Sequence, residues 1–376
     1  MKSEVGADAE QKDMSAKQAN IPNTWIFNMQ STASLLIALG GFCKAMVDLG
    51  CLPGDLVYRW AESCFFVFQL PVFYFGYGYL FQKQWRVRNR ADWCHSMKYH
   101  VVYMLVPLVF ITFFTLLINS WVGANPSLSL ENLINATFVN PVIPVGFFLV
   151  ALVMYALTPT FATQKQMIGF LIVAAIIKVL AIMGALHPAT AADFSALPYV
   201  VQNFCGSWIW FIGGMTLAWQ AEEKTRTLFA VSAKLVAAVL ISIGWLILSL
   251  LLFALSTPAP VLSAVLTATG LFWFTVIFGG RFGDGSQIGF YKFVDRYTKA
   301  IWLLHPMFMK SWFYVLSLAG VQTTGALAGF YVPAHVIGGL VVVYVLPIGI
   351  LWMMNHVGKL GFLVNPNHYF APKDHS

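Results

Sequence analysis

Ten stretches of about twenty mostly apolar residues recur along this chain, and they limit what it can fold into. Backbone N–H and C=O groups in lipid must be hydrogen-bonded within the protein, so such stretches form membrane-spanning helices. A strand barrel is disfavoured, because alternating ten-residue segments are absent from the sequence. The predicted spans are residues 25–47, 60–81, 101–121, 142–160, 167–186, 200–219, 229–254, 260–280, 297–319 and 333–355.

The composition agrees with a membrane protein and excludes other classes. Of the 376 residues, 59% are hydrophobic and 10% are charged, whereas an ordinary soluble domain carries about 25% charged residues. So few charged side chains cannot cover the surface of a soluble enzyme, and the chain is neither disordered nor a nucleic-acid binder. We therefore interpret the net charge of +7 as an orientation signal.

The basic residues alternate from one connecting segment to the next. If the N-terminal tail is cytoplasmic, 17 of the 22 Lys and Arg residues lie in inside segments, four lie within spans, and only Arg59 lies outside. Because cytoplasmic loops are enriched in Lys and Arg, we expect an all-α plasma-membrane protein with about ten transmembrane helices and both termini cytoplasmic. The expected organisation is a polar tail (1–24), a ten-helix membrane domain (25–358) and a cytoplasmic C-terminal tail (359–376).

Polar residues within or beside the spans are candidates for function, because placing them in a membrane is costly. Lys44 and Asp48 are four residues apart, and Arg59 and Glu62 are three apart, so each pair shares a helix face. Each pair either forms a local ion pair or contacts an anionic or hydroxyl-bearing substrate. Lys178 lies in mid-span and needs a carboxylate, a carbonyl or water, so structural pairing and substrate contact are both open.

His305 lies about half-way through the ninth predicted span and directly precedes Pro306. A buried neutral histidine can simply satisfy a hydrogen bond, but it can also transfer protons near neutral pH. The proline frees a backbone carbonyl one turn earlier. A histidine beside such a break is more than packing requires, so we predict a functional role for His305.

The basic segment 83–98, which we predict to be a loop, mixes basic residues with tryptophans. It either rests on anionic lipid headgroups or binds a polyanionic cytoplasmic donor such as a coenzyme A thioester. The five cysteines have no metal-like spacing, so we expect no metal site. The donor-binding candidates are Arg86, Arg88, Arg90, His95, Lys98 and His100.

Several segments resemble, in order, the signature segments of acyltransferase-3 type membrane acyltransferases. FQLPVFYFGYGYLF (68–81) resembles the second-span signature F-H-M-P-L-F-F-F-I-S-G-Y-F-F, and YTKAIWLLHP (297–306) is similar to YTLPIYLLHP. FLVNPNHYF (362–370) resembles the tail FFYPNKY. With further matches at 103–110, 146–159 and 208–218, the resemblance covers roughly residues 25–370 and is closest to the sugar O-acetylase branch.

The resemblance implies an enzyme that moves an acyl group, mostly acetyl, from cytoplasmic acyl-coenzyme A to a hydroxyl of an envelope glycan or lipid-linked sugar. It implies acyl-coenzyme A as a co-substrate and no bound cofactor. The family's first-span histidine falls on Gly41, its second-span histidine falls on Gln69, and its third-span arginine falls near Val102 or Tyr103.

Position in the sequence indicates which residues could take over the roles of these missing family residues. His305 would be the base, and the residues left for contacting the substrate or stabilising charge are Lys44, Arg59, Glu62, Gln69 and Lys178.

A catalytically degenerate member of the family, acting as a glycan or lipid transporter or as a partner subunit, is the alternative. The replaced histidine and arginine favour this alternative, whereas Leu304-His305-Pro306 and the basic segment 83–98 favour catalysis. An unrelated secondary transporter predicts inverted repeats, which are not visible. We expect the acyltransferase.

Overall fold

The computed structural model describes residues 24–48, 56–85, 87–141, 145–187, 189–224, 235–281, 289–320, 328–357, 360–364 and 366. All regular elements in these ranges are helical. In chain order they are α2 (Thr24–Asp48), α3 (Leu56–Trp60), η1 (Ala61–Phe65), α4 (Gln69–Gln84), α5 (Arg90–Trp121), α6 (Leu130–Ile134), η2 (Asn135–Val139), α7 (Gly146–Leu157), α8 (Gln164–Leu186), α9 (Ala191–Ala196), α10 (Tyr199–Lys224), α12 (Leu235–Ala254), α13 (Ala259–Arg281), α14 (Gly289–Leu318), α15 (Ala328–His356) and η3 (Leu360–Leu363).

Seven helical segments in the described ranges are long and apolar enough to cross a membrane, which indicates a multi-pass membrane protein. The 12-residue α7 is shorter; at about 1.5 Å per residue it extends about 18 Å, against a hydrocarbon core of about 30 Å. Helices α10 and α14 have the length but are not among the seven. Ten spans and cytoplasmic termini therefore remain predictions.

Each of the ten predicted apolar stretches coincides with a helix, but two expectations need correction. The second stretch is not one α-helix, because the π-helical turn η1 interrupts it between α3 and α4. The basic segment is not a loop throughout, because α5 begins at Arg90, where the Asn89 side chain accepts a hydrogen bond from the Asp92 N–H. The predicted N-terminal tail, apart from Thr24, lies outside the described residues, whereas the predicted C-terminal tail is described at 360–364 and 366.

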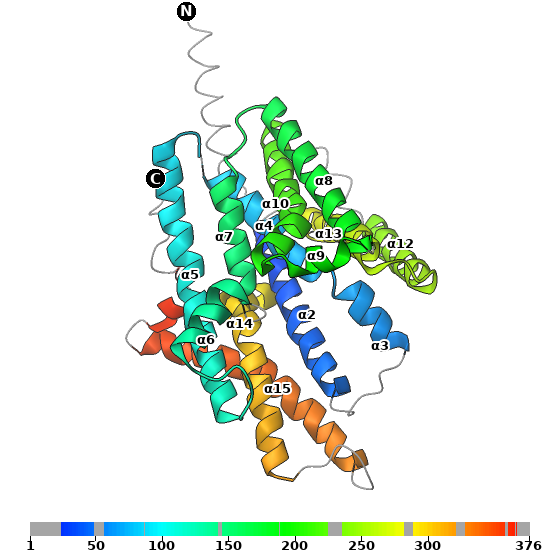
Figure 1. The fold of residues 1–376 in the computed structure, drawn as a ribbon. Coiled ribbons are helices and arrows are strands. Elements are labelled where there is room, and N and C mark those ends of the chain that lie inside the picture. Colours follow the sequence, from blue (N-terminus) through cyan, green and yellow to red (C-terminus); the bar gives the residue numbers. More distant parts are fainter. Residues whose placement is uncertain are drawn as a thin grey trace, which may run out of the picture.

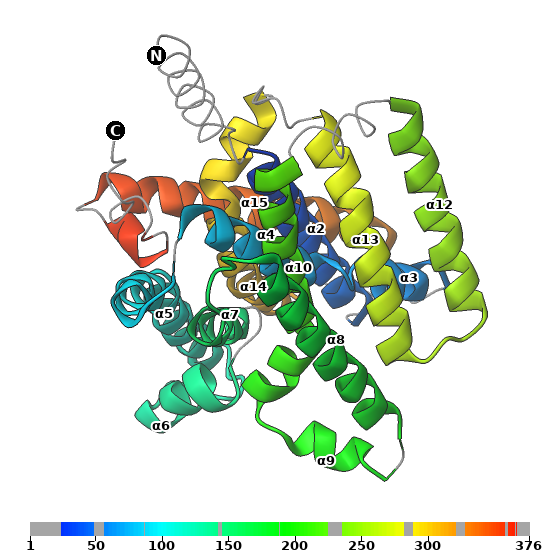
Figure 2. The same ribbon diagram turned by 90° about the horizontal axis from the view of Figure 1, so that it is seen from above.

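Helices α4 and α10 pack backbone against backbone through two glycines. A Cβ atom at Gly78 would meet the carbonyl oxygen of Phe211, and one at Gly214 would meet the carbonyl oxygen of Phe75. Small residues permit such close approach between membrane helices. This pair forms the middle of the bundle, and α12 lies at its edge (Figures 1 and 2).

Helix α2 is the element that organises the candidate site. It contacts α4, α13, α14 and α15, and its side chains Trp25, Ile26, Met29 and Phe42 are almost fully buried. Helix α14 runs beside α2, with Ser31 next to Thr298 near one end and Phe42 next to Phe313 near the other. The two helices therefore run in the same direction, and residues along α14 can be matched in depth to residues along α2.

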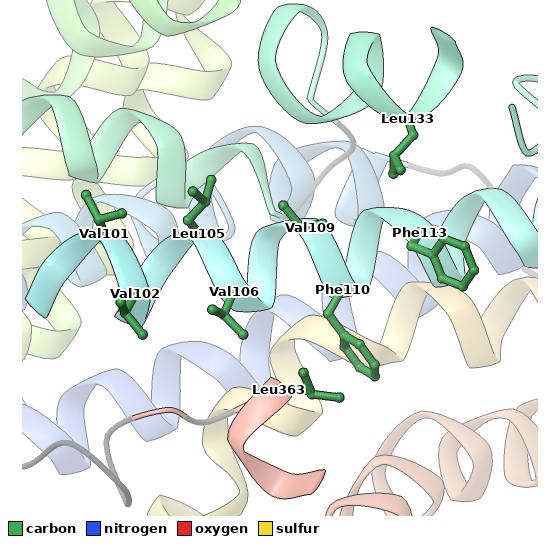
Figure 3. Close-up of a pocket in the computed structure, with 9 residues that line it drawn as sticks. All are labelled: Val101, Val102, Leu105, Val106, Val109, Phe110, Phe113, Leu133 and Leu363. Carbon is green, nitrogen blue, oxygen red and sulfur yellow. The ribbon is translucent and has the colours of Figure 1, made fainter. Parts of the chain in front are cut away.

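An apolar groove of about 510 Å³ follows the outer face of α5. Its lining side chains are all aliphatic or phenylalanine, and they include Leu133 from α6 and Leu363 from η3 (Figure 3). None of the described side chains that line it is titratable, so we place no catalytic chemistry there.

Candidate functional site

A polar cavity of about 890 Å³ lies between the start of α2, the first half of α14 and the last turns of α15. Tyrosines from α4 and α5 complete its wall. Concave sites with a few convergent polar groups are the usual places for ligands. Its polar side chains include Gln30, Asp295, Arg296, Lys299, Asn355 and His356.

Lys299 is the cation inside this cavity. Its Nζ atom is buried and lies 3.2 Å from the centroid of the Tyr103 ring, which provides a cation–π contact. Within the described part of the chain it has no hydrogen-bond acceptor, and no ion pair joins it to Asp295 one turn away. Because a buried ammonium normally has an anionic or carbonyl partner, Lys299 is suited to hold an anionic group of a ligand.

Asp295, also in the cavity wall, connects two helices. Its carboxylate accepts a hydrogen bond from Ser31 Oγ at 3.3 Å, and Ser31 Oγ lies 2.8 Å from Thr298 Oγ1. These contacts tie α2 to α14, and the Asp295 carboxylate lines the cavity together with Lys299 without an ion pair between them among the described residues. Arg296 is exposed, next to the cavity.

His305 lies six residues beyond Lys299 on α14 and is 4% exposed. Its Nδ1 atom lies 2.8 Å from the carbonyl oxygen of Trp302 and 3.2 Å from that of Ile301. Carbonyl oxygens only accept, so in the neutral ring Nδ1 carries the proton and Nε2 keeps its lone pair. The carbonyl of Trp302 is the one that Pro306 cannot bond, so the histidine satisfies it and presents Nε2 as a base.

The Nε2 atom of His305 faces α2. A Cβ atom built on Gly41 would lie 3.2 Å from it. Gly41 is the position onto which the first-span histidine of the resembled family falls. Gly41 and His305 are more than 260 residues apart in the sequence, and each falls on a histidine of the resembled family. They are neighbours in the structure.

An aromatic layer separates the cavity from His305. Phe73 lines the cavity and stacks on Trp302, with ring centroids 4.8 Å apart and planes 15° apart. Trp302 is fully buried and also contacts Phe147 and Phe148. His305 does not line the cavity, so a reaction at Nε2 requires this layer to open.

The described residues among the predicted donor-binding candidates do not line this cavity. Arg88, Arg90, His95 and Lys98 are exposed at the start of α5 or just before it. His100 is instead buried: its Nδ1–H donates to the Ser96 carbonyl oxygen at 2.8 Å, and its ring stacks on Tyr155 at 3.8 Å. The four exposed residues form a basic surface, whereas His100 is part of the aromatic core.

Arg86 lies outside the described residues.

Lys178 has a structural partner. Its Nζ donates to the carbonyl oxygen of Gly206 at 2.8 Å and lies 5.6 Å from the Trp210 ring. Both partners are on α10, so this lysine joins α8 to α10. Of the two possibilities that the sequence left open, the structure provides the pairing.

The remaining candidates lie at the other end of α2. Lys44 pairs with Glu62 at 3.2 Å and with Asp48 at 3.9 Å, so Glu62 bonds across helices and does not pair with Arg59. Gln69 is 1% exposed, and neither atom of its amide has a hydrogen-bond partner within the described residues. Gln69 is therefore buried in the core, and Arg59 and Glu62 line a second pocket.

Sequence reasoning missed Lys299, Tyr103 and Gln30 as cavity residues. Lys299 was counted among the inside positive charges because it lies three residues into the ninth predicted span. Its spacing of four from Asp295 was the available signal, since residues four apart share a helix face.

Comparison of this chain with family models, with curated proteins and with solved structures finds no match.

Proposed function

We propose that this protein is a membrane-bound O-acyltransferase of the plasma membrane. It would move an acyl group from cytoplasmic acyl-coenzyme A to a hydroxyl of an envelope glycan or lipid-linked sugar. The observation that carries this proposal is the 890 Å³ polar cavity whose buried cation, Lys299, lies on the same helix as His305. The pattern of positive charges predicts that this end of α2 is cytoplasmic, the side on which coenzyme A thioesters are available.

The cavity suits the anionic part of such a donor. Lys299 and Arg296 supply positive charge, and Asn355 and Gln30 supply amide groups. Cations bind phosphate oxygens through charge-assisted hydrogen bonds. The thioester of coenzyme A is at the end of a long flexible arm, so the phosphates can remain near Lys299 while the acyl group extends toward His305, about 9 Å further along α14.

The chemistry assigned to His305 is general-base catalysis. Nε2 takes the proton of the acceptor hydroxyl as the hydroxyl oxygen attacks the thioester carbonyl carbon. The carbon–sulfur bond breaks, and the proton passes to the leaving thiolate, which departs as free coenzyme A. The fixed Nδ1–H bond to Trp302 keeps Nε2 in the unprotonated tautomer that this step needs.

The alternative is a family-like protein that binds the same ligand without chemistry, as a transporter or partner subunit. The Phe73–Trp302 stack favours it, because it covers His305 from the cavity. The replacement of a histidine by Gly41 beside Nε2 favours it too. The two functions share the cavity and differ in whether the thioester is consumed.

Replacing His305 with Asn distinguishes the two functions. An asparagine amide can still donate to the freed Trp302 carbonyl, but it has no basic nitrogen. In purified protein with acetyl-coenzyme A and envelope glycan, H305N should lower coenzyme A release about 100-fold or more and leave acetyl-coenzyme A affinity unchanged. If coenzyme A release is unchanged in H305N, His305 is not part of the mechanism. If the unsubstituted protein binds acetyl-coenzyme A but releases no coenzyme A, the transporter or partner subunit is favoured.

A further inference from the structure

A second pocket, of about 870 Å³, lies between the α3–η1 segment and the turn that joins α12 to α13. It is at the opposite end of α2 from the polar cavity, because Glu62 in its wall pairs with Lys44 near the end of α2. We propose that this pocket binds the acceptor, a hydroxyl-rich sugar that carries a carboxylate. The role as acceptor site rests on the proposed acyltransferase function, whereas the binding itself does not.

The charges of the pocket favour an anionic ligand. Lys44 neutralises Glu62 at 3.2 Å. Arg59 also lines the pocket and has no ion pair within the described residues. Its guanidinium is a planar fork that bonds a carboxylate in a bidentate way. Lys44 is shared between Glu62 and Asp48, so the Arg59 guanidinium is the cation of this pocket wall that has no anionic partner among the described residues.

The other polar groups favour hydroxyls as partners. The pocket wall contains the hydroxyls of Ser63, Ser256, Thr257 and Ser263. Each hydroxyl both donates and accepts, which matches the hydroxyl groups of a sugar. Phe253 and Leu262 supply an apolar wall for the C–H face of a sugar ring.

Ser256 occupies a backbone position where glycine is usual. Its φ is +50°, and the bonds Ser256 N–H to Phe253 O and Thr257 N–H to Leu252 O close the end of α12. Glycine is the common residue at this left-handed closing position of a helix. A non-glycine residue here is strained, and strain of this kind concentrates at functional sites. Ser256 places a hydroxyl in the pocket wall, which a glycine at this position could not provide.

The pocket is close in depth to His305. Gly41, whose Cα faces Nε2 of His305, and Lys44 are three residues apart on one face of α2, about 4.5 Å along the axis. A ligand beside Glu62 is therefore about one helical turn from the level of the proposed base. Glu62 and Ser63 lie in the π-helical turn η1, and such turns are frequent at functional sites.

The test measures sugar binding to the full chain in lipid nanodiscs, with glucuronic acid as the probe and glucose as its uncharged counterpart. We expect glucuronic acid to bind roughly tenfold more tightly than glucose, and Arg59→Gln to abolish that difference. Ser256→Gly should weaken both sugars while the melting temperature stays the same or rises. Lys165→Gln, which removes an exposed positive charge at the start of α8, is the control and should change nothing.

Equal binding of the two sugars, or an unchanged preference in Arg59→Gln, would overturn the pocket assignment. Acetyl-coenzyme A turnover, measured in the same preparation, separates this outcome from a failure of the proposed function. Arg59-dependent sugar binding without turnover supports the pocket and removes the acyltransferase. Turnover on a glucuronic acid acceptor with an unchanged KM in Arg59→Gln overturns the pocket and retains the enzyme.

Discussion

At the scale of single residues, His305 has a structural role that is compatible with the chemical role proposed for it. Pro306 removes the N–H that would bond the Trp302 carbonyl, and His305 Nδ1 supplies the replacement at 2.8 Å. That bond fixes the tautomer and leaves Nε2 against Gly41. Backbone chemistry thus accounts for a histidine before this proline, and Nε2 remains for the proposed catalysis.

Lys178 provides the contrasting residue-scale prediction. Because its ammonium bonds a backbone carbonyl that belongs to α10, we expect Lys178→Met to leave acetyl-coenzyme A binding and turnover unchanged. Replacing a buried charge by an apolar side chain of similar volume is often neutral or stabilising, so thermal unfolding in detergent should shift little or upward. A loss of turnover without a loss of folded protein would place Lys178 in the substrate path after all.

At the scale of helices, the α4–α10 contact depends on two glycines. Gly214→Ala would place a methyl group against the Phe75 carbonyl oxygen, which belongs to backbone and cannot move aside. We expect a loss of about 1–3 kcal/mol in the free energy of unfolding. Thermal unfolding of the purified protein measures this.

The neighbouring glycine is the matched control. At Gly213 the nearest atoms to an added Cβ are those of Phe75 at 3.9 Å, an ordinary contact. Gly213→Ala should therefore be neutral, or stabilising by up to about 1 kcal/mol through helix propensity. Equal destabilisation by the two alanines would contradict close packing at Gly214.

The helices could be predicted from the sequence far better than the contacts between them. Apolar stretches of about twenty residues predict helices directly, and helices lie at all ten. The contacts of Lys299 with Tyr103, of Lys44 with Glu62 and of Gly41 with His305 are set by packing between distant segments. A local pattern cannot fix such packing: spacing left an Arg59–Glu62 pair open, whereas Glu62 pairs with Lys44. Lys299 fits the alternating pattern of positive charges, so the sequence indicates an orientation signal there and not a cavity residue.

At the scale of the whole molecule, the two polar pockets lie at opposite ends of α2. Gln30 lines one and Lys44 borders the other, about 21 Å apart along the helix. His305 lies between them, in contact with Gly41. A donor from one side of the membrane and an acceptor from the other could therefore meet at one base, provided that the aromatic layer of Phe73 and Trp302 opens.

The most direct test of this account is the affinity of the purified protein for acetyl-coenzyme A, compared with that of Lys299→Met. If Lys299 holds an anionic group of the donor, the methionine should weaken binding about tenfold or more, and Lys299→Arg should restore part of it. An affinity that is the same in all three proteins would contradict the assignment of the cavity to an acyl-coenzyme A donor, as would the absence of any binding.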